Sequence, residues 1–220
     1  DLAELDLSNC GLIDSFDSKG FLGSREKLEM LHLTGNNLTR VPDNLYRLHL
    51  RTLDLGSNNI KTSMTDSLLD VFPGLNRYSG RDAQGSDLAT RVLERLDLSH
   101  NKITGSLPSN VFSSAWGVDR LSVLDVSHNE IIGTFPHVFA SLRLFSIDAS
   151  NNRLSGYLHN SLTILQSLHL LDVRNNRLRE CNSTGTDCSD QLVMVTGKTA
   201  IDQPEAICKT VEAQNLPHAQ

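Results

Sequence analysis

Aspartate, serine and histidine, the residue types of a hydrolytic triad, occur together at 97–100 (Asp-Leu-Ser-His) and at 125–128 (Asp-Val-Ser-His). A triad needs the imidazole between the nucleophile and the acid, with an oxyanion hole nearby. Here the residues stand on one expected strand and point the same way onto an open surface. The sequence also has no glycine-rich phosphate loop, no His-Glu-x-x-His and no Cys-x-x-Cys. We therefore expect no catalytic residues, no metal and no cofactor.

The composition argues against two classes of partner. The chain has 220 residues, of which 39% are hydrophobic, enough for a folded core. Its net charge is −6 and its lysines and arginines form no cluster, so we expect no nucleic-acid partner. The longest nearly apolar run, at 192–195, is far shorter than the roughly 20 residues of a membrane helix. We expect membrane attachment only through segments outside this chain.

The elements that position these residues come from a repeat, Leu-x-x-Leu-x-Leu-x-x-(Asn or Cys)-x-Leu, in which other aliphatic residues replace some leucines. Successive repeats start 22 to 28 residues apart, except for one interval of 43. The segment x-x-Leu-x-Leu-x-x predicts a short strand with inward leucines, and stacked repeats predict a parallel sheet with about 4.8 Å between strands. The pattern is already running at the first residue, so we expect a piece of a longer protein. The seven repeats begin at Leu2, Leu28, Leu50, Leu93, Leu121, Leu144 and Leu168.

This repeat resembles the leucine-rich repeat family over residues 1–180. NKITGSLPSNVF and NEIIGTFPHVFASL further resemble the plant-type extracellular subclass, whose repeats continue with Gly-x-(Ile or Leu)-Pro. NRLSGYLHNSLTIL keeps the glycine but has His159 in place of the proline. The resemblance implies an α/β solenoid, a horseshoe with a parallel β-sheet on its concave face. Its convex side is expected to be mostly irregular, with 3-10 turns and short strands.

The ninth position of the repeat must hold a side chain that satisfies backbone groups in the turn leaving the strand. Asparagine fills it in six repeats and Cys10 fills it in the first. We predict that the asparagines form a buried structural ladder and that Cys10 is a buried free thiol. The ladder residues are Asn36, Asn58, Asn101, Asn129, Asn152 and Asn176.

The interval of 43 residues has two interpretations. We favour one expanded repeat with an insertion at 61–92, because YSGRDAQGSD is rich in loop residues. The alternative is a degenerate repeat from Phe72, which would place Arg77 at an inward position, where an unpaired charge is costly. Irregular loops are common sites of function, so we predict ligand contacts from 61–92 and 113–120. The loop residues are Tyr78, Arg81, Asp82 and Trp116.

The middle outward position of the strands is aspartate in six of the seven repeats. Like charges on adjacent strands repel, although neighbouring hydroxyl side chains can bond the carboxylates. The row is interpreted as family consensus, with a surface for a cationic partner or a weak divalent-cation site as alternatives. Val123, Phe145 and Leu170 form a possible apolar contact patch. The predicted ligand-binding residues are Met30, His32, Arg51, Asp54, Arg95, Asp97, Val123, Asp125, Phe145, Asp148, His169, Asp172 and Arg174.

Residues 181–220 lie after the last repeat and carry three of the four cysteines. The tail resembles the disulfide-stapled cap of extracellular family members, which implies a bridge between Cys181 and Cys188, with Cys188 and Cys208 as the second choice. Reduced cysteines remain an alternative. Glycosylation sequons occur at Asn37 and Asn182. Together these features favour an extracellular or cell-surface location over a cytoplasmic one.

A scaffold whose outward residues are free to vary favours recognition. We expect a non-catalytic domain that binds a protein or peptide, the ligand-recognition part of a larger surface or secreted protein. One alternative is a structural subunit of a larger assembly, such as a cell wall, a matrix or a surface filament. A second alternative is an intracellular scaffold.

Overall fold

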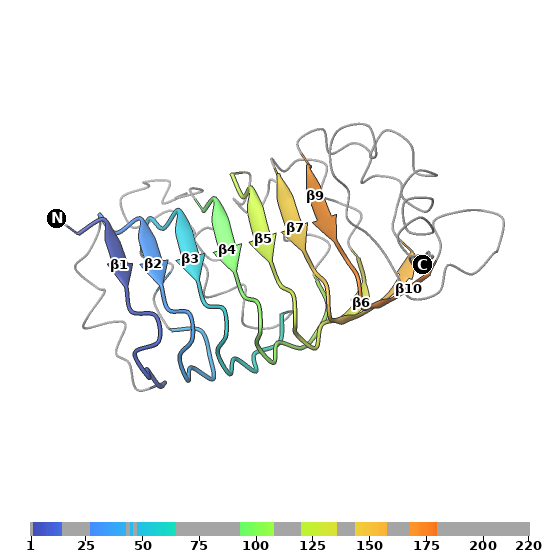
Figure 1. Ribbon diagram of the computed structural model, residues 1–220, viewed down its shortest axis with the longest axis horizontal. Coiled ribbons are helices and arrows are strands. Elements are labelled where there is room, and N and C mark those ends of the chain that lie inside the picture. Colours follow the sequence, from blue (N-terminus) through green and yellow to red (C-terminus); the bar gives the residue numbers. More distant parts are fainter. Residues whose placement is uncertain are drawn as a thin grey trace, which may run out of the picture.

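The computed structural model describes residues 2–14, 27–42, 45, 48–64, 93–107, 120–135, 144–157 and 168–179. These residues form two parallel sheets (Figure 1). The first contains, in spatial order, β1 (Glu4–Asp6), β2 (Met30–His32), β3 (Thr52–Asp54), β4 (Arg95–Asp97), β5 (Val123–Asp125), β7 (Ser146–Asp148) and β9 (Leu170–Asp172). The second contains β6 (Ile132–Thr134), β8 (Arg153–Tyr157) and β10 (Arg177–Arg179).

The first sheet keeps one register throughout, so equivalent repeat positions lie side by side. Leu31 pairs with Leu53, and Leu53 pairs with Leu96. In the first sheet, the central residue of every strand except β1 is buried, because alternate side chains of a strand point to opposite faces. Burying one leucine contributes roughly 2 kcal/mol. The leucine-rich solenoid with a parallel sheet is confirmed.

Strand β1 is an edge strand with a single hydrogen-bonded neighbour. Its inward residues Leu5 and Leu7 are only partly buried, and nearby Ile13 is 55% exposed. The prediction for Cys10 was wrong on burial. Its thiol is free but exposed, because it belongs to this edge coil, and it lies 3.4 Å from the carbonyl oxygen of Ser8.

Strands β3 and β4 are direct neighbours in the sheet, although their repeats begin 43 residues apart. The two coils stay in contact beyond the strands. The Lys102 N–H donates to the Ile60 carbonyl, and the Met64 N–H donates to the Thr104 carbonyl. Residues 65–92 lie outside the described part of the chain, so the insertion at 61–92 stays a prediction.

The glycine of the Gly-x-x-Pro signature lies in or beside the second sheet. Gly105, Gly133 and Gly156 have φ of 80°, 83° and 79°, a region that favours glycine. A Cβ atom on Gly133 would lie 2.9 Å from Ser106 Cβ, and one on Gly156 would lie 2.9 Å from Thr134 Cγ2. These glycines let successive coils approach closely, and the expected short strands on that side form there.

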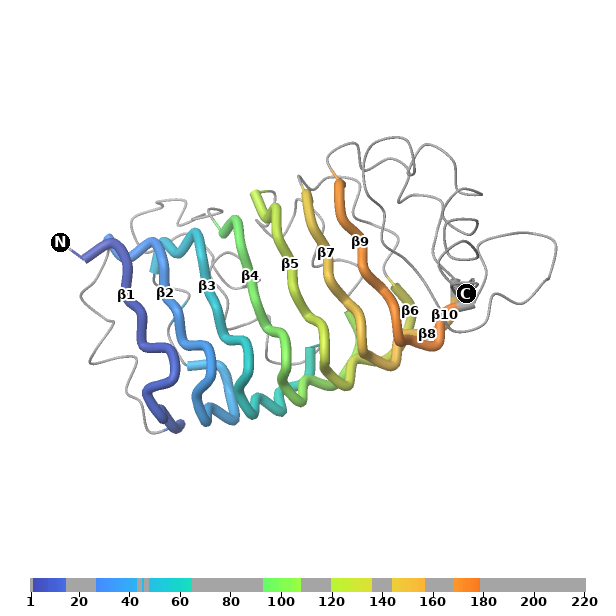
Figure 2. Tube along the Cα trace, in the orientation of Figure 1, coloured from blue at the N-terminus to red at the C-terminus, as the bar shows by residue number. Residues whose placement is uncertain are grey.

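Each first-sheet strand is followed by a turn at the same edge of the array, and these turns lie side by side (Figure 2). The outward side chains therefore form columns that run across the strands. These columns contain all thirteen residues predicted to bind a ligand.

Candidate functional site

The turns that hold the outward face are tied together by the ladder asparagines. Asn129 Nδ2 donates to the carbonyls of Leu98, Val126 and Ser127 at 2.9, 3.1 and 3.0 Å. Its Oδ1 accepts the Ile103 N–H at 2.9 Å. One buried amide thus joins its own turn to the preceding coil. The same set of bonds is made by Asn58, Asn101, Asn152 and Asn176, and Asn36 accepts one N–H more.

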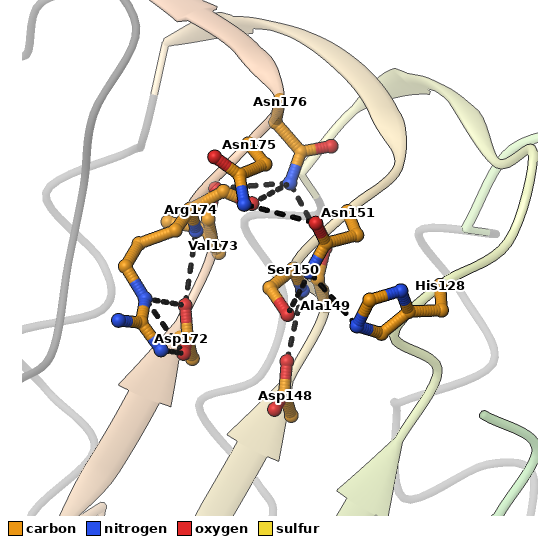
Figure 3. A network of polar contacts seen from close by, with 10 residues as sticks. All are labelled: His128, Asp148, Ala149, Ser150, Asn151, Asp172, Val173, Arg174, Asn175 and Asn176. Carbon is orange, nitrogen blue, oxygen red and sulfur yellow. Dashed lines mark hydrogen bonds and ion pairs between the residues drawn. The ribbon is translucent and has the colours of Figure 1, made fainter. Parts of the chain in front are cut away.

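The residue before each ladder position forms a second row, which the sequence analysis missed. The His100 and His128 rings stack, with centroids 4.0 Å apart. Asn151 Nδ2 lies 3.1 Å from His128 Nε2, and Asn175 Nδ2 donates to Asn151 Oδ1 at 2.9 Å (Figure 3). The signal available in the sequence was the recurrence of Asn, Gly and His at this position, since these residues suit a positive φ. The residues with positive φ here are Asn9, Gly35, Ser57, His100, His128, Asn151 and Asn175.

The two histidines of the triad-like stretches lie in this row. Each ring faces its counterpart on the neighbouring coil. The aspartates instead bond the backbone two residues later, so that the Ser99 N–H donates to Asp97 Oδ1 and the Ser127 N–H donates to Asp125 Oδ1, both at 2.9 Å. The three residue types are therefore used locally, in separate contacts.

The aspartate column has this backbone role along most of the face. Ser8, Ser150 and Arg174 donate their N–H groups to the aspartates two residues earlier, at 2.8 to 3.0 Å. Each bond uses the Oδ1 atom of the carboxylate. The column thus caps the ends of the strands and still presents charge to solvent.

Most charges over β2, β3 and β4 are paired. Arg51 Nε lies 3.0 Å from Glu29 Oε2, and Arg51 Nη1 lies 2.6 Å from Glu94 Oε1. Both carboxylates raise the pKa of Arg51, Glu94 the more strongly. Such exposed ion pairs contribute little to stability, but Arg51 offsets part of the negative charge of the two glutamates.

Asp54, at the C-terminal end of β3, also lies close to a side chain from each neighbouring strand. Asp54 Oδ2 lies 2.5 Å from His32 Nδ1, and Asp54 Oδ1 lies 3.5 Å from Arg95 Nε. At the other end of the sheet, Arg174 contacts both oxygens of the buried Asp172, with Nη2 to Oδ2 at 2.5 Å (Figure 3). That contact is the main cause of the raised pKa of Arg174.

Three consecutive carboxylates between these ends have a different environment. Asp97, Asp125 and Asp148 form no ion pair with any cation of the described chain. Burial raises the pKa of Asp125, hydrogen bonds from Ser127 oppose the rise, and the charges of Asp97 and Asp148 add to it. The centre of the concave face is therefore anionic.

An aromatic pair lies beside this anionic centre. Phe145 is 49% exposed and stacks on the His169 ring, with centroids 4.4 Å apart. The two residues precede β7 and β9, which are neighbouring strands. Val123 and Leu170 on the same face are partly buried, as is Met30 on β2. Among the described residues in or directly beside the strands of the first sheet, Phe145 is the large hydrophobic residue with the highest exposed fraction.

Several predicted residues lie outside the part of the chain that the structure describes. Asn37 is described and is exposed. Within the described segments, no three His, Cys, Asp or Glu side chains converge as a metal site would require. These segments also hold no helix long and apolar enough to span a bilayer. The residues outside are Tyr78, Arg81, Asp82, Trp116, Cys181, Cys188, Cys208 and Asn182.

The families whose sequence profiles match this chain have the repeat fold described above. The leucine-rich repeat profile covers residues 1–60 and 91–154, and a second leucine-rich repeat profile covers 49–75. The chain belongs to the leucine-rich repeat family. It resembles plant extracellular ectodomains of that family. Receptor-like protein 35 of Arabidopsis thaliana is 30% identical over 81% of this chain, and receptor-like protein 32 is 31% identical over all of it. The chain spans only 20% and 26% of these two curated relatives.

Solved structures share the fold. The Arabidopsis receptor kinase HAESA, in complex with the peptide hormone IDA and the co-receptor SERK1, matches 80% of this leucine-rich repeat chain with a TM-score of 0.58 and 26% identity, over 26% of its own chain. The ectodomain of GASSHO1/SCHENGEN3 from Arabidopsis thaliana, in complex with CASPARIAN STRIP INTEGRITY FACTOR 2, matches 70% with a TM-score of 0.53 and 26% identity, over 16% of its own chain. A plant ice-binding protein matches 80% with a TM-score of 0.57 and 25% identity, over 50% of its own chain.

Proposed function

We propose that this chain is a non-catalytic recognition domain that binds a peptide or protein ligand on its concave face, as part of a larger receptor-like protein. The observation that carries the proposal is the exposed Phe145 ring stacked on His169, on an open sheet whose other outward residues are polar, charged or partly buried. Exposed aromatic side chains on a rigid surface are frequent anchors in protein interfaces.

Two comparisons support this assignment. The HAESA structure is a complex with a peptide hormone, and the GASSHO1/SCHENGEN3 structure is a complex with CASPARIAN STRIP INTEGRITY FACTOR 2. Both share the solenoid fold of this chain. The triad-like stretches offer no catalytic arrangement, because their histidines stack on each other and their aspartates cap the backbone.

We place the domain outside the cell or on its surface. Asn37 is exposed and begins a glycosylation sequon, Asn-Leu-Thr. Expression through the secretory pathway of a eukaryotic host should attach a glycan there. In intact mass spectrometry, we expect the secreted Asn37→Gln variant to be lighter than the unchanged chain by the mass of one glycan. An unmodified Asn37 in the secreted protein would count against this location.

The recognition proposal is tested by panning a random dodecapeptide display library on the immobilised chain. Enriched peptides are then measured against Phe145→Glu and a matched control, Ile132→Glu. Ile132 lies on β6 of the second sheet and is 51% exposed, so the substitution has a comparable local cost. We expect Phe145→Glu to weaken binding at least tenfold and Ile132→Glu to leave it unchanged. Failure to enrich any peptide, or equal binding to both variants, overturns the proposal.

A further inference from the structure

The concave face contains an internal example of how its aspartate column binds a cation. Asp172 accepts the Arg174 N–H on Oδ1 at 3.0 Å, and the same side chain then receives the Arg174 guanidinium on both oxygens. A carboxylate in this column can therefore cap its strand and hold a guanidinium together. Planar, two-point contacts of this kind are what arginine makes and lysine does not.

Asp125 and Asp148 share the backbone arrangement of Asp172 but not its cation. The Ser127 N–H and the Ser150 N–H each donate to the Oδ1 atom of these aspartates at 2.9 Å. Within the described chain, neither carboxylate has an ion pair. The two residues are paired in register on β5 and β7, so an incoming guanidinium could contact both.

The apolar contact, Phe145, lies immediately before β7, the strand that carries Asp148. Phe145 precedes Asp148 by three residues, which separates them by about 10 Å along an extended chain. The face therefore offers an aromatic surface and two carboxylates without an ion pair within the reach of three peptide residues, although the Asp148 charge already acts on Arg174 at longer range and helps to raise the pKa of Arg174. On the strands β2 to β4, ion pairs already use most of the corresponding charges.

We propose that the concave face over β5, β7 and β9 binds a peptide segment with an arginine, whose guanidinium lies over Asp125 and Asp148, and with an apolar side chain about three residues away, packed on Phe145 and His169. This assignment rests on the proposed function and specifies the chemistry of its ligand. Opposite charge at a partly desolvated surface gives both affinity and orientation.

The test uses two synthetic peptide libraries on the whole chain. In both, flanking positions vary among leucine, phenylalanine, serine and glycine, and the central residue is arginine in one library and citrulline, its neutral isostere, in the other. We expect the arginine library to bind about ten- to a hundredfold more tightly. Raising the salt concentration should narrow the difference, because surface charge is screened.

The matching variants replace aspartate by asparagine, which keeps the Oδ1 acceptor for the backbone N–H. The double variant Asp125→Asn with Asp148→Asn should lose at least tenfold in affinity for the arginine library. Asp6→Asn is the control, because Asp6 has the same backbone bond on β1, at the far end of the sheet. Asp6→Asn should leave the affinity for the arginine library unchanged.

The outcomes separate this inference from the function on which it rests. Equal binding of the two libraries, with loss of both in Phe145→Glu, overturns the arginine site and leaves peptide recognition standing. Equal affinity of the double variant and Asp6→Asn for the arginine library also overturns the site. Binding by neither library, together with a failed panning experiment, overturns both proposals.

Discussion

Single residues hold the coils of this solenoid together through buried amides. Asn129 gives three donor contacts to backbone carbonyls and accepts the buried Ile103 N–H. Each carbonyl has one further donor, whereas Asn129 Oδ1 is the acceptor for the Ile103 N–H, so removing the amide leaves that buried N–H unsatisfied. The ladder is therefore the most sensitive set of polar residues for stability.

We expect Asn129→Ala to lower the free energy of unfolding by about 2 to 4 kcal/mol, because the buried Ile103 N–H loses its acceptor and three carbonyls each lose one of two hydrogen bonds. Asn59→Ala is the control. Asn59 is only partly buried and its side-chain bonds, to Asn37 and Lys102, lie at the surface. Its substitution should change stability by less than about 0.5 kcal/mol. Urea denaturation measures both, and equal losses would contradict the ladder's role.

Asp125 should give the opposite result, a substitution that stabilises. Its folded-state pKa is raised, so its contribution is fully present below the unfolded pKa and is lost as pH rises through the folded pKa. At neutral pH its charge therefore costs stability. Asp125→Asn keeps the backbone acceptor and removes the charge. We expect a thermal midpoint a few degrees higher at pH 7, with the gain shrinking as the pH falls through the folded pKa and gone below the unfolded pKa of about 4.

Thermal unfolding followed by circular dichroism from pH 3 to pH 8 checks this pH dependence. Asp6→Asn serves as the reference, because hydrogen bonds from Ser8 lower the pKa of Asp6. Its charged form is favoured by folding, so its substitution should bring no gain at neutral pH. A gain of the same size in both variants would mean that net charge, and not the Asp125 environment, decides the effect.

Some residue roles could be predicted from the sequence and others could not. The ladder positions follow from the repeat itself, since the turn after a strand must satisfy its own backbone groups. The pairing of Arg51 with Glu29 and Glu94 could not be predicted, because it depends on which long side chains meet across strands. The stacking of His100 on His128 also depends on a positive φ that brings both rings to one side.

Among the elements, the strands of the first sheet were predictable because period-two alternation and a fixed repeat specify them. The strands of the second sheet were expected only as short strands on the convex side. Their positions depend on how closely the coils approach, which is decided at Gly133 and Gly156. The glycine of the family signature thus has a steric function that the sequence pattern alone does not reveal.

This steric function can be measured by replacing Gly133 with alanine. We expect Gly133→Ala to destabilise the fold by about 2 to 3 kcal/mol, since it adds both a strained φ and a contact with Ser106. Gly11→Ala isolates the strain, because Gly11 has φ of 67° and open space around its Cβ position. It should cost about 1 kcal/mol. Similar urea midpoints for both variants would show that close approach adds nothing.

At the scale of the 220-residue chain expressed by itself, stability should fall toward β1. In a solenoid each coil is stabilised only by its neighbours, and β1 has one described neighbour where β5 has two. We expect the Leu7 amide, bonded to the His32 carbonyl, to exchange with deuterium faster than the Val126 amide, bonded to the Asp148 carbonyl.

Hydrogen exchange followed by mass spectrometry resolves these two amides in separate peptides. The rate difference should persist at low denaturant concentration, where local opening dominates. Exchange of both amides at one rate would show instead that the coils unfold as a single unit, without progressive opening from an edge.

The uniform register of the first sheet also fixes the spacing of the contacts that an extended ligand can make when it crosses the strands. The columns repeat about every 4.8 Å, so two coils span about 9.6 Å. A peptide in the polyproline II conformation turns the same face to a surface every third residue, after about 9.3 Å. The two periods nearly coincide. A ligand in that conformation would keep one side chain of every three in step with alternate coils, and its mismatch would grow by only about 0.3 Å at each contact.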